Sequence, residues 1–353
     1  MLAIETFDPD LASDDDWLAL NTFHNALRAE EWPNDLPLPV EKTRLDMTVR
    51  PPQDRSYVWV ARENGGRIIG WAGLWMEEAE TNQHLGWTTV GILPAYRRRG
   101  MASRLLAELA PVARQHGRTM LMGDTDADIP AGAAFAEALG ATPGLATKTN
   151  QLNIAEVDRA MLRQWIQRAH ERAEGFSLGV WEGAAPDEDI DNFAHLLEGS
   201  SNDEPRGDLA IEHETFTVQH MRDWEASMRA RRIEQWIAWV RDETTGRLAG
   251  YSTVRWNPFE PDRLWQAGTG VLREYRNRGL GRWLKAAMLE KVLRERPSVR
   301  VIRTGNADAN APMLKINHEL GFKPAKSWML YQIPIDDLEK ALSAHVHATL
   351  VML

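Results

Sequence analysis

The chain reads Ile92-Leu93-Pro94-Ala95-Tyr96-Arg97-Arg98-Arg99-Gly100-Met101-Ala102 at one point and Val271-Leu272-Arg273-Glu274-Tyr275-Arg276-Asn277-Arg278-Gly279-Leu280-Gly281 at another. A tyrosine, two arginines and a glycine recur at a constant spacing of 179 residues. Apolar residues at helical spacing follow each glycine, so both turns are predicted to lead from a strand into a helix.

The surroundings of the two turns repeat as well. Residues 57–74 and 235–254 both read strand, polar turn, strand, and each copy closes with a Leu-Gly pair at Leu139-Gly140 or Leu320-Gly321. Because the whole order of elements recurs, the sequence indicates an internal duplication, which has to be found before single motifs are interpreted.

The repeat and the length of 353 residues together favour two domains. We expect an N-terminal domain over 1–155, a connecting helix over 156–175, a C-terminal domain over 176–334 and a helical tail over 335–353. Ser13-Asp14-Asp15-Asp16 resembles a capping box and predicts the start of an early helix.

Composition excludes several classes of function. The formal net charge of -10 argues against nucleic acid as a partner, because such binding depends on clustered Lys and Arg. The chain has no cysteine, which excludes disulfides and covalent cysteine catalysis. No apolar stretch is long enough to span a membrane, and no leader-like segment is recognisable, so we expect a cytoplasmic protein that does not bind membranes. We also expect no metal site. An oligomer is possible.

The glycine turns have the chemistry of an anion site. A strand that runs through Arg-x-x-Gly-x-Gly/Ala into a helix presents unpaired amides at a helix N-terminus, where the helix dipole favours a diphosphate. The side chains of Arg97, Arg99, Arg276 and Arg278 can add charge-assisted hydrogen bonds. Neither turn ends in Gly-Lys-Ser/Thr, and neither meets the context of a dinucleotide fingerprint.

At this point the chain resembles the GNAT superfamily of N-acetyltransferases, whose Gln/Arg-x-x-Gly-x-Gly/Ala signature matches 97–102 and 276–281. The resemblance covers nearly the whole chain as two tandem units, as in mycothiol synthase-like actinobacterial acetyltransferases. It implies an α/β (α+β) fold in which each domain is a mixed, mostly antiparallel sheet flanked by helices.

The resemblance also implies a fourth strand, ending at Ile92 or Val271, that splays from its neighbour and holds acetyl-CoA or another acyl-CoA as cosubstrate. The turn residues expected to bind the cofactor are Ile92, Leu93, Arg97, Arg98, Arg99, Gly100, Met101 and Ala102, and Val271, Leu272, Arg273, Arg276, Asn277, Arg278, Gly279, Leu280 and Gly281.

A second element of the family reads Asn-x-x-Ala-x-x-Leu-Tyr-x-x-x-Gly-Phe, and the second copy follows it with Asn310 and Met313. Asn317 stands at the tyrosine position; an amide is no general acid, so Asn317 is expected to hydrogen-bond cofactor or substrate, as is Asn306. The first copy has neither the Asn nor the Tyr. We therefore favour the second domain as catalytic and the first as structural or regulatory, although the first can still bind CoA.

No residue stands out as general base. The acids nearest upstream of the fourth strand are Glu260 and Asp262, and Tyr275 or water is a source for the proton that the thiolate needs. For the acceptor, the loop with Asn202 and Asp203 and the pair Trp256 and Trp265 are expected to contact substrate. Solvated loop charges and core packing are the alternatives for these residues.

We therefore predict an acyl-CoA-dependent N-acyltransferase that transfers its acyl group directly to a small-molecule amine. The alternatives are an acyl-CoA-binding or regulatory protein without turnover and a protein N-acetyltransferase.

Overall fold

The computed structural model describes residues 2–63 and 66–351, which form two compact units. Unit 1 consists of Met1–Ala146, Arg206–Glu212 and Ser327–Leu353, and unit 2 consists of Thr147–Pro205 and His213–Lys326. The units thus follow the folded sheets and differ from a simple division of the sequence near residues 155 and 175.

Unit 1 is a mixed sheet with helices. Its strands, in sheet order, are β1 (Leu2–Thr6), β2 (Asp54–Glu63), β3 (Arg67–Glu77), β4 (Leu85–Ile92), β5 (Met120–Asp126) and β12 (Lys323–Pro334). Its helices are α1 (Asp14–Glu31), α2 (Val40–Thr48), the 3-10 turn η1 (Pro94–Tyr96), α3 (Met101–Gln115), α4 (Pro130–Ala138) and α10 (Ile335–Val351). Only β4 and β5 pair in parallel among the pairs described here; the others are antiparallel.

Unit 2 repeats this plan. Its strands, in sheet order, are β6 (Thr142–Asn153), β11 (Val301–Ala307), β10 (Arg263–Val271), β9 (Leu248–Trp256), β8 (Glu234–Asp242) and β7 (Phe176–Glu182). Its helices are η2 (Ile154–Glu156), α5 (Arg159–Arg172), α6 (Ile190–Ser201), α7 (Val218–Ala230), η3 (Arg273–Tyr275), α8 (Leu280–Glu295) and α9 (Ala311–Leu320). The expected α/β class with a mixed, mostly antiparallel sheet is confirmed.

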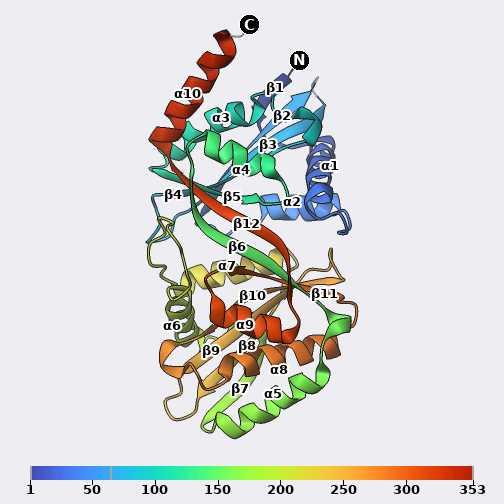
Figure 1. The fold of residues 1–353 in the computed structure, drawn as a ribbon, viewed down its shortest axis with the longest axis vertical. Helices are drawn as coiled ribbons and strands as arrows, with labels where there is room; N and C mark the ends of the chain where they lie inside the picture. The colour runs from blue at the N-terminus through green and yellow to red at the C-terminus, as the bar shows by residue number, and fades with distance from the viewer. Residues whose placement is uncertain (1, 64–65, 352–353) are drawn as a thin grey trace. The chain divides into compact units, whose positions relative to one another are not determined.

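The two units exchange their last strands, and Figure 1 shows the paths of β6 and β12. Strand β6 leaves unit 1, and its residues Thr147–Asn153 pair antiparallel with β11 of unit 2. Strand β12 makes the reverse journey, and its residues Trp328–Pro334 pair antiparallel with β5 of unit 1. Each sheet is therefore completed by the other half of the sequence.

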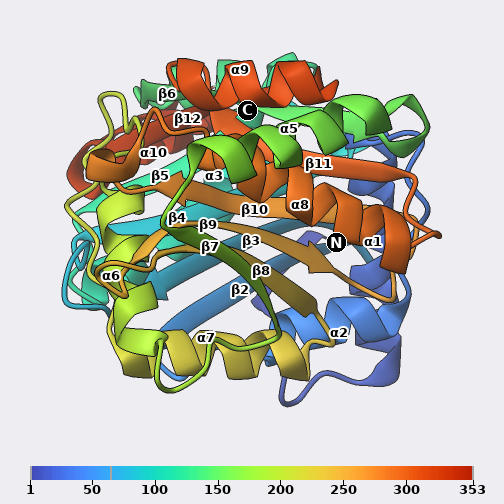
Figure 2. The same ribbon diagram turned by 90° about the horizontal axis from the view of Figure 1, so that it is seen from below.

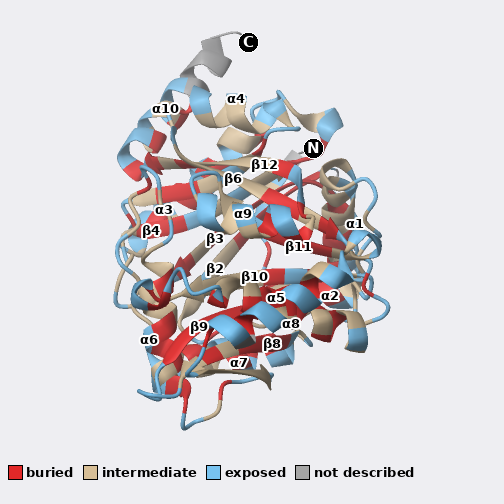
Figure 3. Cartoon of the chain, turned by 60° about the horizontal axis from the view of Figure 1, so that its bottom comes forward, coloured by how far each residue is buried: buried red, intermediate tan, exposed pale blue. Residues whose placement is uncertain are grey.

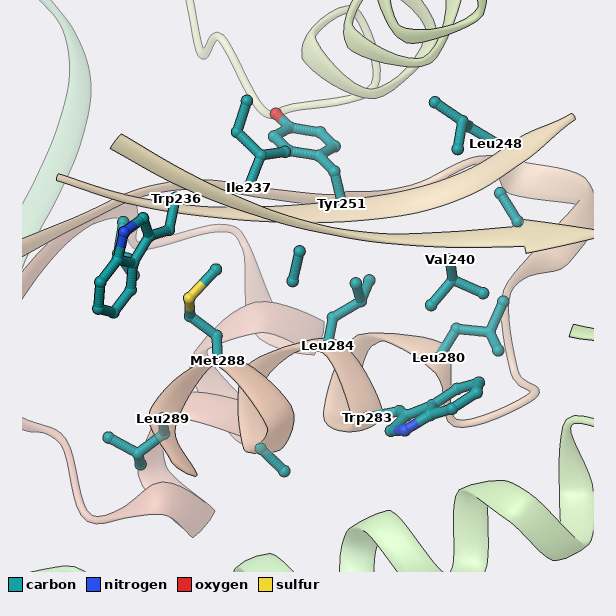
Figure 4. Close-up of a cluster of buried hydrophobic side chains, with 14 of the residues drawn as sticks. Trp236, Ile237, Val240, Leu248, Tyr251, Leu280, Trp283, Leu284, Met288 and Leu289 are labelled. Atoms are coloured by element: carbon teal, nitrogen blue, oxygen red, sulfur yellow. The ribbon is translucent and has the colours of Figure 1, made fainter. Parts of the chain in front are cut away.

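Helices cover both faces of the unit 2 sheet, as Figure 2 shows: α8 and α5 lie on one face, and α6 and α7 on the other. Leu284 and Met288 point from α8 into the sheet, while Tyr251 of β9 points to the opposite face (Figure 4). Both α8 side chains are essentially buried, which stabilises the unit by about 1.5–3 kcal/mol each.

Two helices begin at residues whose side chains cap them. Helix α5 begins after Asp158, which caps it, and buries Leu162 and Trp165 while its outer face stays exposed (Figure 3). Helix α1 begins with the predicted capping box, because the hydroxyl of Ser13 and the carboxylate of Asp16 each bond the other residue's backbone amide.

Candidate active site

Both glycine turns adopt the same backbone conformation, in which residues of opposite φ sign alternate. Arg98 and Gly100 have φ of 63° and 72°, and Asn277 and Gly279 have φ of 64° and 82°. These four residues are exposed. Alternation of right- and left-handed residues turns successive amides toward one point and makes a concave anion site.

The amides of these turns are available to a ligand. In unit 2 the first helical bond runs from the amide of Trp283 to the carbonyl of Gly279, at 3.1 Å. Within the described part of the chain, no backbone carbonyl accepts from the amides of residues 277–282, nor from those of 98–103 in unit 1. Each helix therefore begins with several free donors at the positive end of its dipole.

In unit 2 the first arginine of the turn braces the strand end. Arg276 donates from Nε to the carbonyl of Val271 at 3.0 Å and pairs with Asp203 at 2.8 Å. The same carboxylate pairs with Arg273 at 2.7 Å. Asp203, expected to recognise the acceptor, thus lies in the structure as the anchor of two turn arginines.

Unit 1 contains the equivalent brace. Arg97 donates from Nε to the carbonyl of Ile92 at 3.0 Å, and its guanidinium forms a two-fold ion pair with Glu30 at the end of α1. Arg97 and Arg276 are therefore engaged within the protein, so a diphosphate contact from either would require it to leave its carboxylate.

The third arginines are held near the protein surface by aromatic rings. Arg99 donates to the carbonyl of Ala95 and lies 5.3 Å from the ring centroid of Tyr96, and Arg278 lies 5.6 Å from that of Phe176. The remaining turn residues end the strands, follow them as buried leucines or begin the helices: Ile92, Leu93, Met101 and Ala102 in unit 1, and Val271, Leu272, Leu280 and Gly281 in unit 2.

The fourth strand of each unit separates from its parallel neighbour, as the resemblance implies. Strand β4 pairs with β5 only over Leu85–Trp87, and β10 pairs with β11 only over Arg263–Trp265. The remainder of β4 and of β10, toward the glycine turn, is not paired with that parallel neighbour. Each of these strands therefore has an open edge there. An extended ligand can hydrogen-bond to such an edge as an added strand does.

Strand β10 also carries a bulge. Its register against β9 shifts between Gln266 and Thr269, so Ala267 and Gly268 face a single residue, Thr253. The pairing of β4 with β3 in unit 1 runs without a shift. A bulge turns backbone groups out of the ladder and is frequent beside active sites.

Comparison with known proteins agrees with this geometry. A sequence model of the Acetyltransferase (GNAT) family matches residues 23–141 and 204–322. The chain belongs to this family. It is an N-acetyltransferase of the tandem GNAT type that depends on acyl-CoA, as the sequence predicted. No curated protein sequence matches the chain.

Solved GNAT structures are similar over almost the whole chain. A tandem GNAT protein from the clavulanic acid biosynthesis pathway, solved without AcCoA, is 27% identical with a TM-score of 0.75, and the match covers 95% of this chain and 99% of that one. A GCN5-related N-acetyltransferase from Sphaerobacter thermophilus is 14% identical with a TM-score of 0.64 over 95% and 96% of the two chains, which shows the fold alone.

The predicted GNAT residues of unit 2 meet in a buried polar chain. Lys285 of α8 donates from Nζ to Oδ1 of Asn317 at 2.7 Å, and Nδ2 of Asn317 donates to Oδ1 of Asn306 at 2.8 Å. Asn150 of the exchanged strand β6 donates to the same oxygen at 3.4 Å. Burial lowers the pKa of Lys285 to about 7, because desolvation disfavours its charged form.

A lysine ammonium only donates, so Lys285 fixes which end of the Asn317 amide faces it. The Nδ2 of Asn317 must then face Asn306, whose Oδ1 is occupied by two donors. Among the residues that the structure describes, the Nδ2 of Asn306 has no partner, so a donor remains beside the open edge of β10.

The part of unit 1 that the structure describes has no such polar chain. The glycine-turn spacing pairs Lys285 with Leu106, and the shared Leu-Gly ending and strand register pair Asn317 with Ala136 and Asn306 with Thr125. Lys285 was not among the residues predicted from sequence, although its replacement by leucine in the other copy was visible in the repeat.

Two further residues of the predicted motif lie at the start of α9. Asn310 is its N-cap, and its side-chain oxygen accepts from the amide of Met313 at 3.4 Å. This contact satisfies one of the free donors of the helix. A role of either residue in cofactor binding stays a prediction.

The three groups proposed for acid–base catalysis lie away from the open edge. Glu260 pairs with Arg263 and, like Asp262, lies before the paired start of β10. The hydroxyl of Tyr275 donates to Asp242 at 3.3 Å, and its ring packs edge-on against Phe176. Their catalytic roles remain untested predictions.

The acceptor candidates divide between structural contacts and an exposed ring. Asn202 exchanges two hydrogen bonds of 2.9 Å with the backbone of Glu214 and so closes its loop. Trp256 stacks on Arg296, with the guanidinium 4.9 Å from its ring centroid. Trp265 is 41% exposed at the point where β10 and β11 part.

The described residues contain no group of three His, Cys, Asp or Glu side chains arranged to hold a metal ion. No described helix combines the length and the apolar character needed to cross a membrane. The C-terminal tail carries two histidines, His345 and His347, that could suggest a metal from sequence, but their side chains lie outside the described ones.

Proposed function

We propose that this enzyme transfers an acetyl group from acetyl-CoA directly to the amine of a small molecule, and that unit 2 carries out the reaction. The observation that carries the proposal is that, among the described residues, unit 2 alone combines an open fourth-strand edge with a buried chain like that of Lys285, Asn317 and Asn306. The diphosphate would lie on the amides of residues 277–282, where the helix dipole favours it.

In this reaction the acceptor nitrogen attacks the thioester carbon, the carbon–sulfur bond breaks, and the thiolate takes up the proton that the amine loses, through water. The chain has no cysteine, so the acyl group passes without a thioester on the enzyme. Backbone amides released by the bulge at Ala267 and Gly268 can stabilise the oxyanion, and Nδ2 of Asn306 can donate to the sulfur. Lys285 acts through the amides that it orients and is therefore a positioning residue.

The helix that covers the other face of the open strand also differs between the units: it is α1 in unit 1 and α6 in unit 2. A Cβ added at Gly91 would come within 2.5 Å of Leu27, and a Cβ added at Gly270 would come within 2.4 Å of Ser200. The helix over the open strand therefore presents a bulky apolar group in unit 1 and a small polar one in unit 2.

The acceptor class is supported by one relative. The tandem GNAT protein that shares 27% identity over nearly the whole chain comes, by its description, from the clavulanic acid biosynthesis pathway, whose product is a small molecule. Transfer to a small amine is accordingly preferred to acetylation of a protein.

The test is release of CoA from acetyl-CoA with a panel of small amines and, separately, with a lysine-rich protein. The proposal predicts turnover with small amines that Gly279→Val abolishes, because valine strains a residue with φ of 82° and crowds the diphosphate. Turnover only with the protein would favour a protein N-acetyltransferase. Acetyl-CoA binding without any release would favour a regulatory, acyl-CoA-binding protein.

A further inference from the structure

A ring of three polar side chains spans the bulge of β10. Gln266 donates from Nε2 to Oγ of Ser252 at 2.8 Å and to Oγ1 of Thr269 at 3.2 Å, and the two hydroxyl oxygens are 2.9 Å apart. Ser252 is fully buried and Gln266 nearly so. Because a hydroxyl can donate and accept at once, each of the three groups bonds both others. We call Ser252, Gln266 and Thr269 the bulge triad.

The bulge triad requires the bulged register. Side chains alternate between the two faces of a regular strand, so residues three apart, such as Gln266 and Thr269, would lie on opposite faces. The extra residue of the bulge brings both side chains to the face that carries Ser252. Pairing of β10 with β9 without the extra residue would turn Thr269 away and break both of its contacts. The bulge triad therefore stabilises the bulge relative to a regular strand.

A tyrosine covers the bulge from the opposite face of the sheet. Ser252 lies on the α8 face, because Gly250, two residues earlier, faces Leu284. Tyr251 is buried and points the other way (Figure 4), and a Cβ added at Gly268 would come within 2.5 Å of its hydroxyl. The bulge thus lies between the bulge triad and a buried ring, and it cannot shift without displacing one of them.

The fold does not require the bulge triad, because unit 1 builds the same strand pair from apolar residues. The strand registers align the pair Ser252 and Thr269 with Ala72 and Val90, and β4 pairs with β3 without a bulge. Thr88 pairs with β3 where Gln266 pairs with β9, and among residues 2–63 and 66–351 its buried hydroxyl has no partner. A function specific to unit 2 explains why bulge and triad occur together there.

The bulge lies at the proposed reaction site. Strand β10 pairs with β11 only as far as Trp265, so Ala267 and Gly268 stand at the start of the open edge. An oxyanion site is effective when its donors are aimed before the reaction, because reorienting them during the reaction costs free energy. Side chains that fix the bulge therefore supply what transfer from a thioester needs at this place.

We propose that the bulge triad holds the backbone amides of Ala267 and Gly268 in the orientation that polarises the thioester carbonyl of acetyl-CoA. Its three members act through the backbone and are positioning residues. Since these amides bind the developing oxyanion more strongly than the carbonyl, the triad contributes more to kcat than to the affinity for acetyl-CoA. This inference rests on the proposed function of unit 2.

The experiment uses Thr269→Val, which removes one hydroxyl and keeps the shape of the side chain. Infrared spectra are recorded for acetyl-CoA with a carbon-13 thioester carbonyl, free and bound to the full-length protein. We expect binding to lower the stretching frequency of this carbonyl, and Thr269→Val to lose at least half of the shift. The kcat of CoA release with small amines should fall at least tenfold, while the Kd of acetyl-CoA from calorimetry changes less than threefold. The infrared measurement needs no acceptor.

Three further variants serve as controls. Thr269→Ser keeps the hydroxyl and should retain most of the infrared shift and of kcat. Thr88→Val makes the same change in the fourth strand of unit 1, where the hydroxyl has no described partner, and should alter neither. Thermal unfolding checks that each variant is folded. Ser252→Ala removes a second member of the bulge triad, should cause the same losses, and decides the question if Thr269→Val does not fold.

The infrared and calorimetric results separate the two levels of the argument. Acetyl-CoA that binds to the unaltered protein without a carbonyl shift, or with a shift that folded Thr269→Val and Ser252→Ala both keep, would overturn the inference alone. The same holds if kcat and affinity fall by equal factors. Absence of acetyl-CoA binding in the unaltered protein would overturn the proposed function and the inference with it.

Discussion

The Nζ atom of Lys285 lies 2.7 Å from Oδ1 of Asn317, and both side chains are only 2% exposed. The contact brings a charge-bearing group into the core of unit 2, where unit 1 has Leu106 and Ala136. A buried polar chain of this kind orders its members, because each unmade hydrogen bond inside a protein is costly.

The buried lysine makes stability depend on pH. Its pKa falls from 10.5 in the unfolded chain to about 7 in the folded protein, so between these values the unfolded chain binds more protons. This contribution to stability therefore increases as the pH rises from 7 to 10.5, by at most about 1.4 kcal/mol per pH unit. Below pH 7 the full cost of the buried charge is present.

Replacing Lys285 by Met should remove this dependence. The free energy of unfolding of the unaltered protein and of Lys285→Met is measured with denaturant at pH 6.5 and at pH 9. Relative to Lys285→Met, the unaltered protein should be more stable at pH 9 than at pH 6.5. Leu106→Met, at the same helix position of unit 1, is the control. A difference that is the same at both pH values would mean that Lys285 keeps an ordinary pKa.

Asn306→Ala should weaken acetyl-CoA use. The change removes the amide donor beside the open edge of β10, and one hydrogen bond of about 1 kcal/mol corresponds to a several-fold rise in the KM of acetyl-CoA. Thr125→Ala, at the matching position of unit 1, should leave this KM unchanged. Equal effects of both changes on steady-state kinetics would argue that the two units bind cofactor alike.

Asp203→Asn should loosen the second glycine turn. Its carboxylate holds Arg273 and Arg276, and Arg276 in turn braces the carbonyl of Val271. Because these guanidinium groups are partly exposed, each pair contributes no more than about 1 kcal/mol, and we expect up to a fivefold rise in the KM of acetyl-CoA. Glu30→Gln, which removes the matching brace from unit 1, should change the KM of acetyl-CoA less than Asp203→Asn does. A larger effect of Glu30→Gln would contradict the assignment of the reaction to unit 2.

Because β12 pairs with β5, removing the C-terminal end of the chain should affect a strand about 200 residues earlier in the sequence. A chain ending at Lys326 lacks the part of β12 that pairs with β5, so the amides of Met120–Asp126 should lose protection from hydrogen exchange. A chain ending at Leu342 keeps β12 and should keep that protection. Protected β5 amides in the shorter chain would show that β12 is dispensable for unit 1.

Local rules made much of the architecture predictable from sequence. The strand-to-helix turns at Gly100 and Gly279, the ends of β4 and β10 and the capping box of α1 each depend on a few neighbouring residues, and all are found as expected. The exchange of β6 and β12 was not predictable, because both copies carry the same pattern and nothing local states which sheet a last strand joins.

In the candidate site too, the features that depend on neighbouring residues were predictable and those that depend on tertiary pairing were not. Trp265 of β10 and Arg303 of β11 are far apart in the sequence and become neighbours only through strand register. Lys285 was hidden for another reason: Leu284 and Met288 complete the apolar face of α8, so the helical pattern gave no sign of a buried charge between them.

The central claim is that acyl-CoA is held on the second glycine turn, and calorimetric titration of acetyl-CoA into Gly279→Val and Gly100→Val tests it most directly. Both glycines have positive φ and open space around them, so the two variants are matched in strain. We predict that Gly279→Val lowers the affinity for acetyl-CoA at least tenfold. Gly100→Val should keep the affinity of the unaltered protein. Unchanged affinity in Gly279→Val, with loss in Gly100→Val, would contradict the account.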